Sequence, residues 1–319
     1  MYKVNDLNKV IKTAHRITID DSSKIILMGD CHRGDGSWAD DFYKNRNIYY
    51  SALNYYYNNN YTYIELGDGD ELWENRRYKD IIDEHRDVFF LLSRFHNEDR
   101  LFLIFGNHDM YKKNESFVDK NLKKYFDKRQ NKYIALFRNP IIHESVLLKY
   151  KETGNNILLI HGHQVDFLNY NLWKVAKFLV RHLWRPLELI GVNDPISTAK
   201  NNEKRERVGK KLIKWVLNEK HMLISGHTHR PVFPKLGEPL YFNVGCCVNP
   251  NYITGIEIAN GNIYLVKWDI KTQNDGTLYV KREIVTKPRR LVEFFNQEKV
   301  PITSGRFKIN FYDFDIVTD

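Results

Sequence analysis

The stretch that decides the fold is residues 25–34, Ile25-Ile-Leu-Met-Gly-Asp-Cys-His-Arg-Gly34. An apolar run ends at Gly29, and Asp30 and His32 follow, one residue apart. Side chains two apart in an extended backbone point to the same face, so a buried strand would carry a carboxylate and an imidazole to its carboxyl end. Both groups bind metal ions, although a buried Asp–His hydrogen bond explains the pair equally well.

The composition is that of an ordinary globular protein, with 319 residues of which 42% are hydrophobic. That length suits one large domain or two small ones. We find neither an uncharged apolar run of about 18 residues that would span a membrane nor the apolar core of a secretory signal. The three cysteines (Cys31, Cys246 and Cys247) make no disulfide framework or zinc motif, so we expect a cytoplasmic location.

The net charge of +9 favours an anionic partner, such as nucleic acid, a phosphorylated substrate or an acidic lipid headgroup. The positive charge is explained equally simply if it only keeps the protein soluble.

The amino-terminal half alternates apolar strands with helical patterns. Strands are expected at 24–29, 61–66 and 101–105, with helices at 42–57 and 78–95 between them. This β-α-β-α-β order implies parallel strands joined by helical crossovers. The polar residues that follow each strand should therefore emerge at one edge of one sheet, where open α/β sheets bind their ligands.

After residue 145 the strand signals are closely spaced. They predict a hairpin over 145–160 and further strands at 222–225, 241–244, 252–258, 262–268 and 278–285. We expect these to form a second, antiparallel-rich sheet packed on the first. The fold class is therefore α/β, with two sheets in a sandwich.

An insertion between the strands lacks sheet character. Residues 167–185 predict a helix with one apolar and one basic stripe, which Pro186 ends, and residues 197–220 predict a second basic helix. We expect them to form a helical cap at 167–221, within a catalytic domain of residues 1–286. A tail at 287–319 follows.

Five polar clusters follow apolar runs, and each adjoins a glycine: Asp30/His32, Asp68, Asn107/His108, His161 and His227/His229. Each alone has a structural explanation, but together on one β-α-β frame they predict a metal site. Two Asp, one Asn and four His are too many ligands for one ion and suit two ions that share a carboxylate. Mn²⁺, Fe, Zn²⁺ and Co²⁺ all accept such oxygen and nitrogen donors, and Mn²⁺ is our first choice.

These motifs, taken in order as Asp-x-His, Gly-Asp-x-x-Glu, Gly-Asn-His-Asp, His and Gly-His-x-His, resemble the calcineurin-like metallophosphoesterase superfamily over roughly residues 24–268. The resemblance implies a four-layer αββα sandwich. It also implies a two-metal phosphoesterase that hydrolyses a phosphodiester or pyrophosphate by in-line attack of a metal-bridging hydroxide.

The resemblance also implies residue roles. Asp30, His32 and His229 would bind one metal, Asn107, His161 and His227 the other, and Asp68 would bridge them. His108 would be the general acid and Asp109 would orient it. Arg33, which follows the first ligand pair, either contacts a substrate phosphate or is a solvated loop residue.

The substrate is less defined. Residues 67–73, Gly-Asp-Gly-Asp-Glu-Leu-Trp, resemble the UDP-2,3-diacylglucosamine hydrolase branch, in which a cap grips acyl chains. Trp173, Phe178 and Trp184 could likewise meet a nucleotide- or lipid-linked substrate or an anionic membrane surface, or simply pack as core. That branch usually has Arg where His108 stands. The alternative is a serine/threonine protein phosphatase-like or nuclease activity, with the basic cap tracking phosphates.

Overall fold

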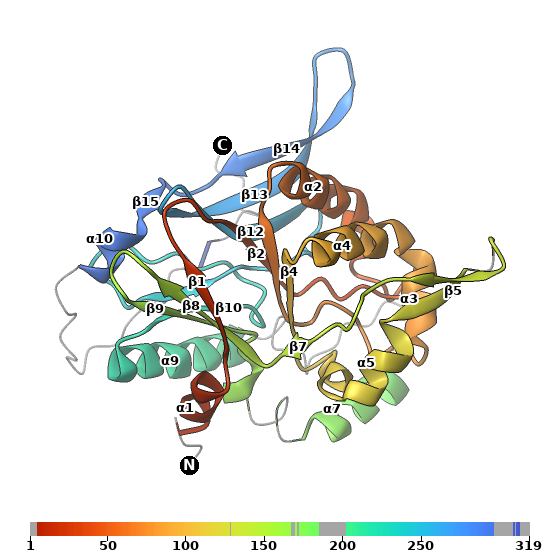
Figure 1. Cartoon of the computed structure of the whole chain (residues 1–319), viewed down its shortest axis with the longest axis horizontal. Helices are drawn as coiled ribbons and strands as arrows, with labels where there is room; N and C mark the ends of the chain where they lie inside the picture. Colours follow the sequence, from red (N-terminus) through yellow and green to blue (C-terminus); the bar gives the residue numbers. More distant parts are fainter. Residues whose placement is uncertain are drawn as a thin grey trace.

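The computed structural model describes residues 5–127, 129–166, 170, 172–184, 202–296, 309 and 311–312 (Figure 1). Two β-sheets lie face to face, one with the order β14-β13-β12-β2-β3-β4-β7 and the other β1-β8-β9-β10-β11. Helices cover the outer face of each sheet, which gives the α/β sandwich expected from the sequence.

The first sheet is built on three parallel strands, β2 (Lys24–Met28), β3 (Thr62–Leu66) and β4 (Leu101–Ile104), with the short β7 (Ile142–His143) beside β4. The predicted β-α-β-α-β order is therefore confirmed. On the side away from β3, β2 pairs antiparallel with β12 (Tyr252–Ala259). Next in the sheet come β13 (Asn262–Thr272) and β14 (Leu278–Ile284), which are also antiparallel to their neighbours. β15 (Arg289–Arg290) also pairs with β13.

The second sheet contains β1 (His15–Ile19), β8 (Ser145–Tyr150), β9 (Asn156–Ile160), β10 (Met222–Ser225) and β11 (Tyr241–Asn243). Only the β8–β9 hairpin is antiparallel, and the other neighbours are parallel. The expectation of one antiparallel-rich second sheet is wrong, because the last three long strands of the chain extend the first sheet instead. An unpaired edge at β2 would expose backbone hydrogen-bonding groups, and β12 covers it.

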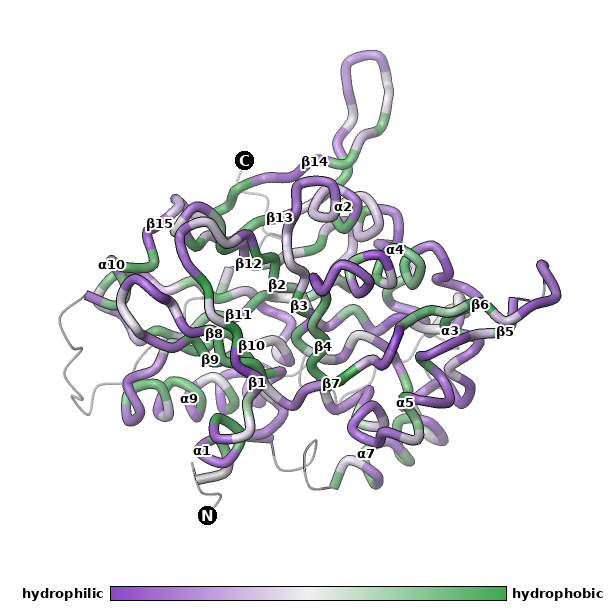
Figure 2. Tube along the Cα trace, in the orientation of Figure 1, coloured by the Kyte–Doolittle hydropathy of each residue, from purple (hydrophilic) through white to green (hydrophobic). Residues whose placement is uncertain are grey.

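Apolar side chains form three layers, one between the two sheets and one between each sheet and its outer helices. Ile25 and Leu27 of β2 face the second sheet, whereas Ile26 and Met28 face helices, so this strand is buried on both sides. That double burial explains why its sequence is a continuous apolar run rather than an alternating one. Figure 2 shows the same distribution, with hydrophobic strands inside and hydrophilic segments outside.

The outer helices are amphipathic. α2 (Arg46–Asn58) and α4 (Arg86–Asn97) pack Tyr49, Leu53, Phe89 and Phe95 against the first sheet. α1 (Asn5–Lys12) and α9 (Asn202–Glu219) cover the second sheet. Shorter elements fill the connections: η1 (Tyr43–Asn45), α3 (Tyr78–Glu84), η2 (Met110–Lys113), α5 (Glu115–Asn121), β5 (Lys124–Asp127), β6 (Lys132–Ala135), η3 (His163–Val165) and α10 (Leu291–Phe295).

The helical cap is not shown as a unit. α9, which was expected to be its second helix, packs Val208, Leu212 and Trp215 in the layer over the second sheet. The described part of the first helix is α7 (Trp173–Leu179), followed by a π-helical turn, η4 (Val180–Trp184). Pro186 and residues 185–201 lie outside the described residues.

The segment expected to be a tail also contributes to the core, since Leu291 and Phe294 of α10 pack between the sheets. In the part of the chain that the structure describes, no helix combines the length and the apolar character needed to cross a membrane.

Candidate metal centre

The candidate ligands stand just beyond the carboxyl ends of five strands drawn from both sheets. Asp30 and His32 follow β2, Asp68 follows β3, and Asn107 follows β4. His161 follows β9, and the pair His227 and His229 follows β10. The structure brings all seven side chains to one edge of the sandwich. The β-α-β order predicts this for the residues after β2, β3 and β4, whereas His161, His227 and His229 come from the second sheet.

The backbone of the site is unusual. Asp30, His32, Asp68, His227 and His229 all have positive φ, between 47° and 69°. Such left-handed conformations are disfavoured for non-glycine residues and collect at functional sites. The same-face argument from an extended strand is therefore wrong in its reasoning, because Asp30 and His32 lie beyond β2 and have left-handed rather than extended backbone.

Two glycines let the strand ends approach each other. A Cβ added to Gly106 would lie 2.1 Å from Asp68 Oδ1, and one added to Gly226 would lie 2.4 Å from Asp30 Oδ2. Neither carboxylate could keep its position next to a larger residue. The glycines that adjoin the polar clusters in the sequence thus make room for the ligands.

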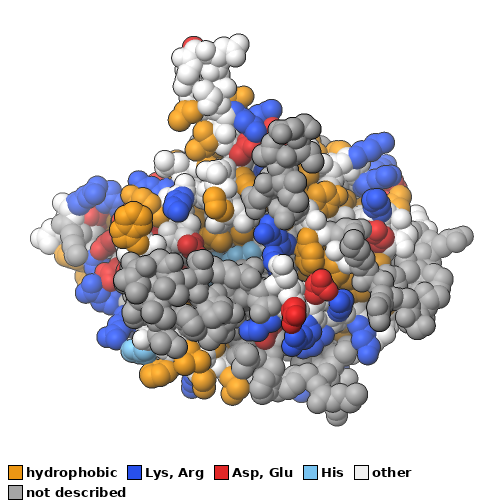
Figure 3. Space-filling model, turned by 180° about the vertical axis from the view of Figure 1, so that it is seen from behind, with side chains coloured by type: hydrophobic (Ala, Val, Ile, Leu, Met, Phe, Trp, Pro, Cys, Tyr) orange, Lys and Arg blue, Asp and Glu red, His pale blue; other side chains and the backbone are white. Residues whose placement is uncertain are grey.

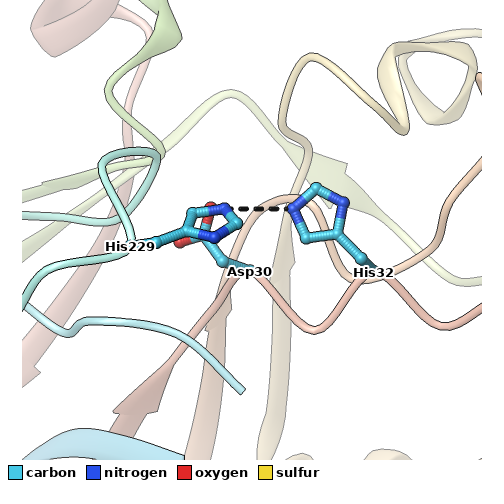
Figure 4. Close-up of side chains that lie close together, drawn as sticks. All are labelled: Asp30, His32 and His229. Carbon is cyan, nitrogen blue, oxygen red and sulfur yellow. Dashed lines mark hydrogen bonds and ion pairs between the residues drawn. The ribbon is translucent and has the colours of Figure 1, made fainter. Parts of the chain in front are cut away.

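The first group of ligands contains Asp30, His32 and His229 (Figure 4). His229 Nε2 lies 3.1 Å from Asp30 Oδ1 and 3.2 Å from His32 Nε2. The backbone N–H of His227 donates to Asp30 Oδ2 at 2.9 Å and so fixes the carboxylate.

The second group contains Asp68, His161 and His227. His161 Nε2 lies 3.1 Å from Asp68 Oδ2 and 3.2 Å from Asn107 Oδ1. Its Nδ1 is 2.8 Å from the carbonyl oxygen of Leu66, which orients the ring. Backbone contacts of this kind commonly fix the tautomer of a metal-binding histidine.

Asp68 lies between the two groups. Its Oδ1 accepts a hydrogen bond from the backbone N–H of His108 at 2.7 Å. Its Oδ2 lies 3.1 Å from His161 Nε2 and 3.8 Å from His32 Nε2. One carboxylate is therefore shared by both groups, as a bridging ligand requires.

The donor chemistry fits divalent cations. Nδ1 of His32 donates to Glu71 and Nδ1 of His161 donates to Leu66, so in the neutral rings both Nε2 lone pairs face the centre. These two nitrogen lone pairs point toward other hydrogen-bond acceptors, the side-chain oxygens of Asp68 and Asn107. A proton or a metal ion can lie between lone pairs that converge in this way, and carboxylate, amide and imidazole donors suit transition metals.

The electrostatics agree with a cation site. Burial disfavours protonated His161, but the carboxylates of Asp68 and Asp30 raise its pKa to about 9. Burial likewise disfavours ionised Asp68, yet His161 and His108 hold the pKa of its carboxyl well below its usual range. The buried carboxylates thus create a field that attracts positive charge.

Glu71 holds His108 in place. Its Oε2 lies 2.7 Å from His108 Nδ1 and 2.8 Å from His32 Nδ1. Burial opposes ionisation of Glu71, but His108 and His32 lower the pKa of its carboxyl to about 2. We assign no role to Glu71 from the sequence. Its place at the end of the Gly-Asp-x-x-Glu motif is the feature that could have indicated a role at the site.

Asp109 does not orient His108 as expected. Its buried carboxylate accepts from the backbone N–H of Gly106 at 2.6 Å and of Gly69 at 3.2 Å, and from Lys112 Nζ at 2.7 Å. It therefore ties the loop after β3 to the loop after β4. This is a structural role beneath the site, with the carboxylate turned to backbone N–H groups rather than to the imidazole.

Arg33 does not face the substrate side either. Its side chain is buried, with Nε 2.7 Å from Asp70 Oδ1 and Nη1 2.8 Å from Glu65 Oε2. Contact with a substrate phosphate is therefore not supported, because the guanidinium is committed to two interior carboxylates.

The space-filling view shows histidine side chains at the bottom of a hollow, with Lys and Arg side chains beside it (Figure 3). His32 and His108 are partly exposed, whereas Asp30, Asp68 and His161 are buried. The partial exposure of these two histidines leaves the centre accessible on one side.

Comparisons with known proteins give one sequence match and distant structural ones. The calcineurin-like phosphoesterase family profile matches residues 23–231. No curated protein matches the sequence. Among solved structures, the chain is similar to Vps29 of Chaetomium thermophilum at 11% identity and a TM-score of 0.39, covering 83% of this chain and 96% of that one.

Proposed function

Because the chain belongs to the calcineurin-like phosphoesterase family, we propose that it is a metal-dependent hydrolase of phosphoric esters. The observation that carries this proposal is the pair of ligand groups that share Asp68. Asp30, His32 and His229 would hold one divalent cation. Asn107, His161 and His227 would hold the other, with Asp68 touching both. Mn²⁺ is the first ion to test.

The residues divide the chemical work. When bound, two divalent cations lower the pKa of a water molecule and offset the charge of the phosphoryl oxygens. His108 is the general acid: Glu71 holds its Nδ1 side, and the ring is 21% exposed, so its other nitrogen can give a proton to the leaving oxygen.

The substrate that we propose first is a phosphodiester or pyrophosphate, linked to a nucleotide or a lipid. Two features support it. Residues 67–73 resemble the UDP-2,3-diacylglucosamine hydrolase branch, and α7 exposes Val175 and Phe178 next to the exposed Lys174. Apolar and basic side chains on one helix suit an acyl chain or an anionic membrane surface. The protein would then work in the cytoplasm, peripheral to the membrane.

The purified protein supplied with Mn²⁺ is expected to hydrolyse bis-p-nitrophenyl phosphate, and removal of metal with a chelator is expected to abolish the reaction. Addition of Mn²⁺ should restore it, as followed by p-nitrophenolate absorbance. Full activity in a metal-stripped sample would refute the two-metal proposal. The same assay should then compare UDP-diacylglucosamine and other pyrophosphates with nucleotides, phosphopeptides and single-stranded nucleic acid, which test the phosphatase and nuclease alternatives.

His108→Ala is expected to slow esters with poor leaving groups more than p-nitrophenyl esters. Loss of a general acid costs about 10²–10⁴-fold when the leaving oxygen needs a proton, and p-nitrophenolate scarcely needs one. Steady-state rates on diphenyl phosphate and bis-p-nitrophenyl phosphate give the comparison. Equal losses on both esters would remove His108 from this role.

A further inference from the structure

The turn that carries Glu71 and Trp73 is held at its amino end by its own glutamate. Glu71 Oε1 accepts from the backbone N–H groups of Trp73 at 3.1 Å and Glu74 at 3.3 Å. Its other oxygen, Oε2, contacts the two histidines described above. One carboxylate thus couples the shape of this turn to the position of His108.

The carboxyl end of the same turn is held by Arg181 from η4, more than a hundred residues away in the sequence. Its Nε donates to the carbonyl oxygen of Trp73 at 2.7 Å. Its Nη2 donates to the carbonyl oxygens of Leu72 at 2.8 Å and Asn75 at 3.1 Å. A planar guanidinium can serve several acceptors at once in this way, which a lysine ammonium cannot match.

Trp73 connects the turn to His108. Its indole stacks on the His108 ring, with centroids 4.1 Å apart and an angle of 20° between the planes. The indole is buried against Ala176 of α7 and Val180 of η4. The helical segment therefore contacts both the indole and the backbone carbonyl oxygen of Trp73.

We propose that Arg181 is a positioning residue for His108, which acts by holding the turn at residues 71–75. The inference rests on the proposed function, in which His108 donates the proton. With the guanidinium in place, the turn presents Glu71 to one edge of the imidazole and Trp73 to one face. π-Helical turns such as η4 are rare and often occur at functional sites.

The proposal gives the segment at residues 173–184 a task other than substrate binding. The ligands stand on strand ends, and in the described part of the chain only His32 among them is linked to the turn by a side-chain contact, through Glu71 at 2.8 Å from its Nδ1. Loss of Arg181 should therefore disturb the proton transfer from His108 more than metal binding. This separation distinguishes a positioning role from a general contribution to stability.

The test compares Arg181→Met with Arg289→Met, which removes a surface arginine that pairs with Glu293. Arg181→Met should lower the rate on diphenyl phosphate by about 10²-fold, the lower end of the effect of a general acid, with little change on bis-p-nitrophenyl phosphate. Arg289→Met should change neither rate. Equal losses on both esters, or no loss on either, would overturn the proposal.

A second measurement is independent of activity. The ring current of Trp73 should shift the NMR signal of the His108 ring upfield in protein without paramagnetic ions, and His108→Ala identifies that signal. Arg181→Met should move the signal back downfield, and Arg289→Met should not. An unmoved signal overturns the positioning role even if the wild type proves to hydrolyse no ester, so the two proposals fail separately.

Two further variants keep the test decisive if Arg181→Met does not fold. Arg181→Lys keeps the charge but has one nitrogen in place of the two that bond the turn, so its loss on diphenyl phosphate should be smaller and equally selective. Trp73→Leu removes the stack while keeping the backbone carbonyl for Arg181, and it should reproduce the selective loss, whereas Trp73→Phe should retain most of the rate. A Trp73→Leu variant with unchanged selectivity would also overturn the proposal.

Discussion

The Asp68→Ala variant is expected to lose the hydrolysis of bis-p-nitrophenyl phosphate almost completely and to bind fewer than two metal ions per chain. Asp68 has a carboxylate oxygen near an imidazole nitrogen of each ligand group, with His161 Nε2 at 3.1 Å and His32 Nε2 at 3.8 Å. Loss of a residue that merely supports a ligand costs about 10–100-fold, so loss of a shared ligand should exceed about 100-fold.

The measurement is metal content by elemental analysis together with the rate at saturating Mn²⁺. Asp119→Ala is the matched control, because Asp119 is an exposed aspartate on α5 that pairs with Lys123 on the surface. It should retain two ions and the full rate. His227→Ala, which removes a ligand of one group only, should also abolish activity. Normal metal content in Asp68→Ala would contradict a shared-carboxylate centre.

The Arg33→Met variant is expected to lower the free energy of unfolding by about 3–5 kcal/mol, the usual cost of removing one partner from a buried ion pair. The guanidinium lies 2.7 Å from Asp70 and 2.8 Å from Glu65, and all three side chains are buried. Asp70 keeps a second partner, Lys112 at 2.6 Å, but Glu65 would be left with tyrosine hydroxyls alone. A buried carboxylate without a cation is costly.

Urea denaturation of the metal-free protein gives the free energy of unfolding for this comparison. Arg77→Met is the control, since Arg77 is 78% exposed and pairs with Asp80 on the surface. That change should cost less than about 1 kcal/mol. A similar cost for both variants would show that the interior pairs of Arg33 do not stabilise the fold more than a surface pair.

Local patterns were enough to place the candidate ligands at strand ends. Apolar runs followed by Gly and a polar residue predicted which side chains stand at strand ends, and the alternation with helices predicted that β2, β3 and β4 are parallel. These features depend on residues close together in the chain. The glycines beside the polar clusters have a steric explanation, since a larger residue at Gly106 or Gly226 would clash with a carboxylate.

Local patterns did not predict which buried acidic and basic side chains pair with each other. Arg33 was expected at the substrate and Asp109 beside His108, yet Arg33 pairs with Glu65 and Asp70, and Asp109 binds backbone N–H groups and Lys112. Several acids and bases lie within a few residues of one another here, and their local sequence fits many pairings. Only the close packing of three loops selects one of them.

The sequence by itself determined the chemistry of this protein: two Asp, one Asn and four His at strand ends, and the family to which they belong. The tertiary structure decided how that chemistry is held. It placed α9 on the second sheet, joined β12 to β2, and set Glu71, Trp73 and Arg181 around His108. The physical reason is that a ligand's identity is a property of one residue, whereas burial and pairing are properties of surfaces that meet only when the chain folds.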